Sequence, residues 1–241
     1  MKIMGNILRD CEKTRQRWPS NFSLSSSCMR NKSFPDSWTR VSSGMCCIRA
    51  GVISKEQLHG AAAQLCGIQP SHFVLELSFS KGLGLKQALS LIKGGTGRVV
   101  GTETSKLNIS AVTRELCEDI ELGALEVCLQ DSELLPFIHN MFDVIYTVNG
   151  NLTWADQTAA LKEIYRVLRP GCLFMTCVYK EPVVTKKKQS KQIQIEREFH
   201  SDEYVQDLKE SGFTKVKIKE HRNAVSGYKY LAVYAYARQM K

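Results

Sequence analysis

Residues 73–84 read FVLELSFSKGLG, and this stretch decides the fold. It opens with a short, largely apolar run that is typical of a buried β-strand. The residues after it place Leu85, Leu89 and Ile92 on one helical face, until Gly94 interrupts the pattern. The sequence therefore predicts a strand, a loop and a helix in succession.

The same unit recurs toward the C-terminus. Short apolar runs predict four further strands, at residues 98–103, 125–129, 142–148 and 172–178. Helices separate several of these strands, because apolar residues recur there at helical spacing.

Two of these helices have recognisable ends. Ser105 is a good N-cap residue, and Ile109, Val112, Leu116 and Ile120 share one helical face after it. The helix AALKEIYRVL is predicted to end at Pro170-Gly171, directly before the strand at 172–178.

The C-terminal part has a different pattern. A helix is predicted around residues 202–211, and alternating strands follow at 215–221 and 228–237. Because only a short loop joins these two strands, we expect them to be antiparallel. Strands that alternate with helices predict a mostly parallel sheet with helices on both faces, the doubly wound α/β class.

Composition and charge limit the function classes. The chain has 241 residues, 43% of them hydrophobic and 24% charged, which is the balance of a globular protein. Nine basic and three acidic residues in 1–54 give +6 of the net charge of +9, so 55–241 contribute +3. We therefore interpret 1–54 as a basic, Ser- and Arg-rich extension and 55–241 as the domain. Nucleic-acid binding is disfavoured because the domain itself has little basic excess.

Cysteines and hydropathy bear on location. The nine cysteines are an odd number without paired CxxC spacing, which favours reduced thiols and no metal site. No apolar run approaches the roughly 18–20 residues of a membrane-spanning helix, so no membrane association is predicted. We expect a cytoplasmic protein, with mitochondrial import through the Arg- and Ser-rich N-terminus as the alternative.

Candidate binding residues follow consecutive strands, where ligands of open α/β sheets lie. The first group is Glu76 with the loop that carries Ser78, Ser80 and Gly82 and opens a helix. Glu103 ends the next strand at a spacing suited to a carboxylate that accepts both hydroxyls of a nucleotide ribose. After the third strand, a further carboxylate can accept from an adenine amino group. Asp131 and Ser132 stand there, and Asn149 follows the fourth strand.

The successive motifs resemble those of class I S-adenosylmethionine-dependent methyltransferases of the small-molecule type. The matching stretches are VLELSFSKGLGL, GRVVGTETS, LQDSELLPF, FDVIYTVN and LKEIYRVLRPGCLFM. The resemblance implies a Rossmann-like, seven-stranded sheet whose last strand is antiparallel. It also implies S-adenosylmethionine as the cofactor, with the 78–82 loop facing its methionine end, Glu103 its ribose, and Asp131 with Ser132 its adenine.

The first loop departs from the family's GxGxG pattern, because Ser78 and Ser80 replace two of its glycines and the loop is degenerate in that sense. The preferred hypothesis is methyl transfer to a small-molecule acceptor, with no catalytic residue identified. One alternative is a non-catalytic binding or regulatory relative, and another is a nicotinamide-dependent oxidoreductase, which shares the loop and the ribose carboxylate. The lysines of residues 180–191 suggest either a solvated loop or a lid that attracts an anionic acceptor.

Overall fold

The computed structural model describes residues 55–179, 199–222 and 229–239, without the side chains of residues 55–57. All described residues belong to one compact unit of the chain, Ile48–Lys241. The predicted extension and the lysine-rich segment 180–191 lie outside the described residues. None of the described helices is long and apolar enough to cross a membrane.

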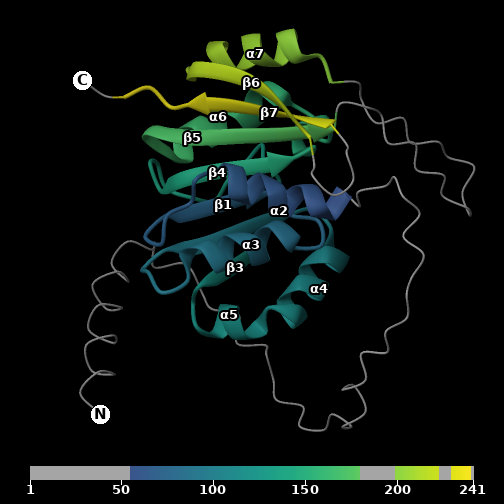
Figure 1. Cartoon of the computed structure of the whole chain (residues 1–241), viewed down its shortest axis with the longest axis vertical. Helices are drawn as coiled ribbons and strands as arrows, with labels where there is room; N and C mark the ends of the chain where they lie inside the picture. Colours follow the sequence, from purple (N-terminus) through teal and green to yellow (C-terminus); the bar gives the residue numbers. More distant parts are fainter. Residues whose placement is uncertain (1–54, 180–198, 223–228, 240–241) are drawn as a thin grey trace, which may run out of the picture. The chain divides into compact units, whose positions relative to one another are not determined.

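A seven-stranded sheet organises the described part of the chain, with strand order β3-β2-β1-β4-β5-β7-β6 (Figure 1). The neighbours from β3 to β5 are parallel, whereas β7 is antiparallel to both β5 and β6. The strands are β1 (Phe73–Leu77), β2 (Arg98–Glu103), β3 (Leu125–Leu129), β4 (Phe142–Val148), β5 (Leu168–Tyr179), β6 (Thr214–Arg222) and β7 (Lys229–Tyr236). This arrangement confirms the predicted doubly wound, Rossmann-like α/β class and the antiparallel C-terminal strand.

Helices precede or connect the strands. They are α2 (Lys55–Leu65), α3 (Leu83–Ile92), α4 (Lys106–Glu115), α5 (Cys117–Glu121), the 3₁₀ turn η1 (Gly150–Leu152), α6 (Gln157–Val167) and α7 (Ser201–Glu210). Helices α2 and α3 pack on one face of the central strands, α6 lies behind β5, and α7 lies at the top beside β6 (Figure 1).

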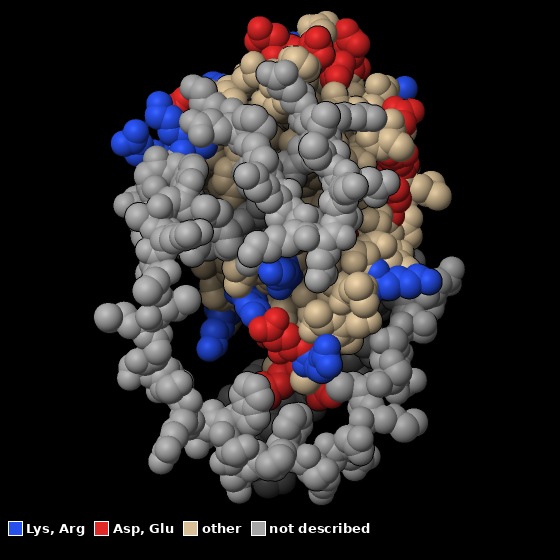
Figure 2. Space-filling model, turned by 90° about the vertical axis from the view of Figure 1, so that its right-hand side faces the viewer, with Lys and Arg blue, Asp and Glu red and all other residues tan. Residues whose placement is uncertain are grey.

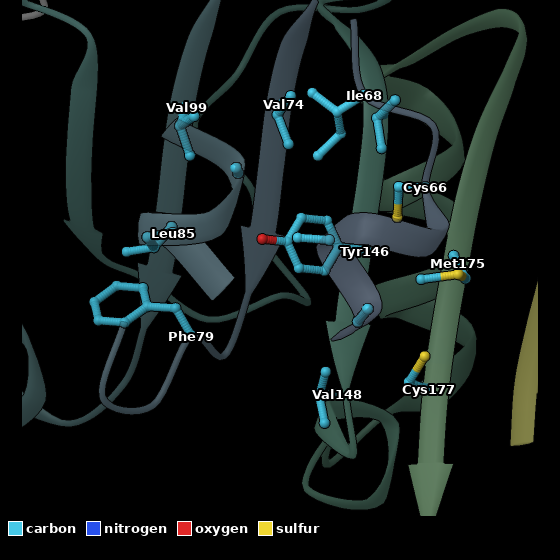
Figure 3. Packing of buried hydrophobic residues seen from close by; sticks show 14 of the residues in the cluster. Cys66, Ile68, Val74, Phe79, Leu85, Val99, Tyr146, Val148, Met175 and Cys177 are labelled. Atoms are coloured by element: carbon cyan, nitrogen blue, oxygen red, sulfur yellow. The ribbon is translucent and has the colours of Figure 1, made fainter. Parts of the chain in front are cut away.

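The core forms where α2 and α3 meet alternate residues of the central strands. Val74, Tyr146 and Met175 come from β1, β4 and β5 and belong to one buried cluster, seen from close by in Figure 3. The strands β1 and β4 are also buried on their other face, as expected for parallel strands covered by helices on both sides. Such strands are mostly apolar, which is why their bounds match the prediction.

The predicted helix end at Pro170-Gly171 is wrong. Helix α6 ends at Val167, and β5 already begins at Leu168 and continues through the Pro-Gly pair. Proline disfavours helical geometry in the residue before it, and Gly171 has a φ of 78°, which accommodates the irregularity between Phe142 and Val144 in the β4–β5 pairing.

Two further helical predictions need correction. The face from Ile109 to Ile120 belongs to two helices, α4 and α5, with Leu116 between them. The Ser105 cap is confirmed, since its hydroxyl accepts from the amide of Asn108 at 3.4 Å. Helix α2 was not predicted at all, because its apolar residues do not form a clear amphipathic pattern.

A pH-dependent stability follows from Glu126 in β3. Burial raises the pKa of its carboxyl from 4.5 to about 7. The folded state therefore holds a proton that the unfolded state releases between these values, and stability falls as pH rises through this window. The Glu126→Gln side chain stays neutral, so this variant should not lose stability over the window. Between pH 5 and pH 8 its free energy of unfolding, measured in urea, should rise by about 1–2 kcal/mol relative to that of wild type.

Glu118→Gln on α5 is the matched control, because Glu118 is exposed. It should keep the wild-type dependence on pH. A Glu126→Gln protein with the same pH profile as wild type would show that Glu126 is ionised throughout this range.

Candidate functional site

The loop after β1 has the backbone of a glycine loop although two of its residues are serines. Ser78 and Ser80 have φ values of 56° and 55°, and Gly82 has a φ of 78°. Residues with a Cβ avoid this left-handed region, so each serine is strained. Three residues of the loop therefore have the left-handed backbone that glycine adopts most readily, and the two serines add side chains to it.

Burial of Phe79 holds this loop against the sheet. Its ring is fully buried between the two strained serines, and its amide donates to the carbonyl of Thr102 at 3.3 Å. A Cβ on Gly101 of β2 would lie 2.6 Å from the Phe79 ring, so only glycine leaves room for it. Helix α3 then begins after Gly82, which offers no side chain to cap its first amides.

Glu103 ties the loop to the end of β2. Its Oε2 accepts from the amide of Ser80 at 2.9 Å, and its Oε1 accepts from the amides of Thr104 at 2.9 Å and Ser105 at 3.1 Å. A carboxylate has about four acceptor positions. Three are thus occupied by the protein, and one position on Oε2 remains for a ligand.

The end of β3 lies beside Glu103. The amide of Gln130 donates to the Glu103 carbonyl at 3.1 Å, which brings the next residue, Asp131, to the same edge. Asp131 is exposed, whereas the Ser132 side chain is buried. The Asp131 carboxylate accepts from the amide of Glu133 at 3.3 Å and stays open to a ligand on its other side.

Asn149 directly follows β4 and has a φ of 54°, also in the left-handed region. Its Oδ1 accepts from the amide of Tyr179 in β5 at 3.3 Å. The next residue, Gly150, packs against the first loop, since a Cβ there would lie 3.4 Å from the Ser78 hydroxyl. The residues after β1, β2, β3 and β4 are therefore gathered at one edge of the sheet.

Glu76 lies beneath this edge rather than on it. Its carboxylate is fully buried, 2.6 Å from Nδ1 of His59 in α2 and 3.0 Å from the Tyr146 hydroxyl in β4. Burial raises the pKa of Glu76, and these two partners oppose that shift. Gly84 leaves room for the Glu76 carboxylate, because a Cβ at this position would lie 2.2 Å from its Oε1.

This arrangement makes Glu76 a support for the loop that follows it. Sequence reasoning did not find its partners His59 and Tyr146. The available signal was the carboxylate itself, since an acidic residue in an apolar strand needs buried hydrogen-bond partners.

Figure 2 looks onto the edge where the parallel strands end. Among the described side chains seen there, basic and acidic groups are interspersed, and acidic groups gather at the top over α7. The acidic residues of this helix are Asp202, Glu203, Asp207 and Glu210.

The described residues fit a nucleoside ligand at this edge. A narrow backbone loop opens a helix after β1, Glu103 retains an acceptor position after β2, and Asp131 is exposed after β3. These are the three elements that the sequence predicted for such a ligand.

Comparison with known proteins agrees with this geometry. Residues 75–176 match the family model described as a methyltransferase domain. Two similar curated proteins are ubiquinone/menaquinone biosynthesis C-methyltransferases UbiE. The protein from Hydrogenovibrio crunogenus is 32% identical over 46% of this chain and 43% of its own length. The protein from Pseudoalteromonas translucida is 30% identical over 48% of this chain and 46% of its own. The chain thus spans less than half the length of the curated relatives it matches.

Solved structures show the same fold at low identity. The [4+2]-cyclase SpnF has a TM-score of 0.61 and 14% identity, covering 77% of this chain and 82% of its own. A methyltransferase from Aquifex aeolicus has a TM-score of 0.57 and 19% identity, covering 76% and 88%. A Haemonchus contortus phosphoethanolamine N-methyltransferase in complex with S-adenosyl-L-methionine has a TM-score of 0.61 and 15% identity, covering 76% and 53%.

The strained loop leads to a stability prediction. Replacing both Ser78 and Ser80 with glycine removes the backbone strain at two left-handed positions. The greater conformational freedom of glycine in the unfolded chain offsets part of this gain in stability. We expect the free energy of unfolding to rise by about 1 kcal/mol in urea titrations.

The variant Ser78→Ala with Ser80→Ala is the control, since it keeps both Cβ atoms and should bring no gain. If the glycine variant were less stable than wild type, the serine hydroxyls would have to contribute more than the strain costs.

Proposed function

Residues 75–176 of this chain are a methyltransferase domain of the class I, S-adenosylmethionine-dependent type, and from this premise we propose that the protein transfers a methyl group from that cofactor to a small-molecule acceptor. The observation that carries the proposal is the left-handed backbone at Ser78 and Ser80. It keeps the glycine-loop conformation in a chain that has lost two of the glycines.

Each strand end has a defined part in holding the cofactor. The backbone of residues 78–82 and the first amides of α3 suit its methionine end, where the helix dipole favours a carboxylate. Glu103 accepts from one ribose hydroxyl, because its other acceptor positions already bind backbone amides. Asp131, with Ser132 beside it, accepts from the adenine amino group.

The cofactor supplies a methyl group that is already activated on a sulfonium. The protein's main contribution is therefore alignment of the acceptor with that group, which is worth up to roughly 7–11 kcal/mol in favourable systems. A general base is needed only for an acceptor that must lose a proton. This explains how the chain functions although no catalytic base was identified in its sequence.

Two observations favour a small acceptor. The named activities of the UbiE and phosphoethanolamine methyltransferase relatives concern small molecules. The domain, residues 55–241, has 24 basic and 21 acidic residues, a net charge of +3, which is little for a nucleic-acid substrate. Quinone-type compounds are one class to test first, given the relatives' names.

The non-catalytic alternative rests on Ser78 and Ser80, whose side chains narrow the loop compared with glycine. Calorimetry separates the two functions: a protein that has lost cofactor binding gives no heat and no thermal shift with S-adenosylmethionine or S-adenosylhomocysteine. The match to a methyltransferase domain favours both of these over the nicotinamide oxidoreductase. A cytoplasmic or mitochondrial location stays a prediction.

The Glu103 assignment leads to a binding prediction. Glu103→Ala removes the ribose acceptor and also releases the amide of Ser80. We expect S-adenosylhomocysteine to bind about 1–3 kcal/mol more weakly, about 5- to 150-fold in Kd, by isothermal titration calorimetry.

Glu118→Ala, an exposed position on α5, should leave the affinity unchanged. Thermal melting of both variants verifies that they are folded. Wild-type affinity in a folded Glu103→Ala protein would place the ribose elsewhere.

A further inference from the structure

Asn151 stands out in the turn that follows β4. It lies in η1 (Gly150–Leu152), and its side chain is 4% exposed. Within the part of the chain that the structure describes, its buried Oδ1 has no hydrogen-bond partner. The neighbouring amide group of Asn149, by contrast, accepts from the amide of Tyr179.

An unpartnered buried carbonyl opposes folding, because it loses its hydrogen bonds to water and gains none in the protein. Leucine has the same branching pattern as asparagine and would fill this position without that loss. An unsatisfied polar group in a native structure needs an explanation, and functional sites are among the places where such exceptions occur.

The position of the turn indicates which ligand this is. Gly150 has Ser78 of the first loop as a near neighbour, with 3.4 Å between an added Cβ and the Ser78 hydroxyl. A Cβ at Gly150 would also lie 2.1 Å from Oγ1 of Thr147, so the turn is packed closely onto the end of β4. Asn151 directly follows this glycine and so lies one residue from the contact with the loop that, on the proposed function, faces the methionine end of the cofactor.

Thr102 is a useful contrast. Its hydroxyl is also buried without a partner among the described residues. However, Thr102 lies inside β2 and pairs with Leu77 of β1 and Cys128 of β3. Asn151 lies in a turn outside the sheet, at the edge where the candidate binding residues gather.

We propose that Oδ1 of Asn151 accepts a hydrogen bond from an O–H or N–H group of the acceptor and so determines specificity for it. The inference rests on the proposed function. It assigns the acceptor to small molecules that carry a hydrogen-bond donor next to the methylated atom. A site with a dedicated acceptor group rejects analogues without the donor, because its buried carbonyl is then left unpaired.

The first test compares two polar-to-apolar replacements of similar shape. Thr147→Val removes a buried hydroxyl that donates to the Leu77 carbonyl at 3.1 Å, and it should lower the melting temperature. Asn151→Leu removes a buried carbonyl oxygen that has no partner among the described residues, and it should leave the melting temperature unchanged or raise it. A fall as large as that of Thr147→Val would show that Asn151 is structural and overturn the proposal.

The second test uses probe pairs that differ only in the donor: phenol with anisole, and aniline with N,N-dimethylaniline. Binding to the full chain saturated with S-adenosylhomocysteine is followed by saturation-transfer NMR. We expect wild type to bind phenol and aniline at least about fivefold more tightly than their methylated counterparts. Asn151→Leu should lose this preference while its affinity for S-adenosylhomocysteine stays within about twofold of wild type.

The possible failures are distinguishable. Absence of S-adenosylhomocysteine binding by wild type would contradict the proposed function itself. Normal binding of this compound with no preference for the donor in wild type, or with the same preference in Asn151→Leu, would overturn the role of Asn151 alone.

Discussion

The carboxylate of Glu103 is the constraint on which the site depends. By accepting from the amide of Ser80 as well as from the amides of Thr104 and Ser105, it joins the end of β2 to the loop after β1. Burial of the Phe79 ring fixes the same loop from below. Two strained serines persist because the structure around them determines their backbone from both sides. A glycine pattern in this loop is thus one way, and not the sole way, to obtain its geometry.

The sheet was largely predictable because its physical cause is local. Strands that lie in a parallel sheet between helices are mostly apolar, and β1, β2, β3 and β4 have the predicted bounds. Predictions failed where local preference and tertiary pairing disagree. Leu168 continues a helical pattern, yet it pairs with Phe142 as the first residue of β5. Helix α2 has too weak a pattern to be recognised and is stabilised by packing against α3, β4 and β5.

The candidate site was predictable to the level of which strand ends carry polar residues. Ser78, Glu103, Asp131 and Asn149 do lie at one edge, as the parallel topology requires. The role of each side chain depends on tertiary contacts between residues that are far apart in the sequence, and these contacts cannot be predicted from the order of residues. The partners of Glu76 are 17 and 70 residues away, and the carboxylate that accepts from the Ser80 amide is 23 residues along the chain.

The close approach of Gly84 to Glu76 limits how this chain can diverge. A methyl group at position 84 would force the buried carboxylate of Glu76 away from its partners, since the Cβ would lie 2.2 Å from its Oε1. Substitution at either position therefore changes what the other tolerates. Among descendants of this sequence the two positions should covary, and a shorter acid at position 76 is the change that would first permit alanine in helix α3.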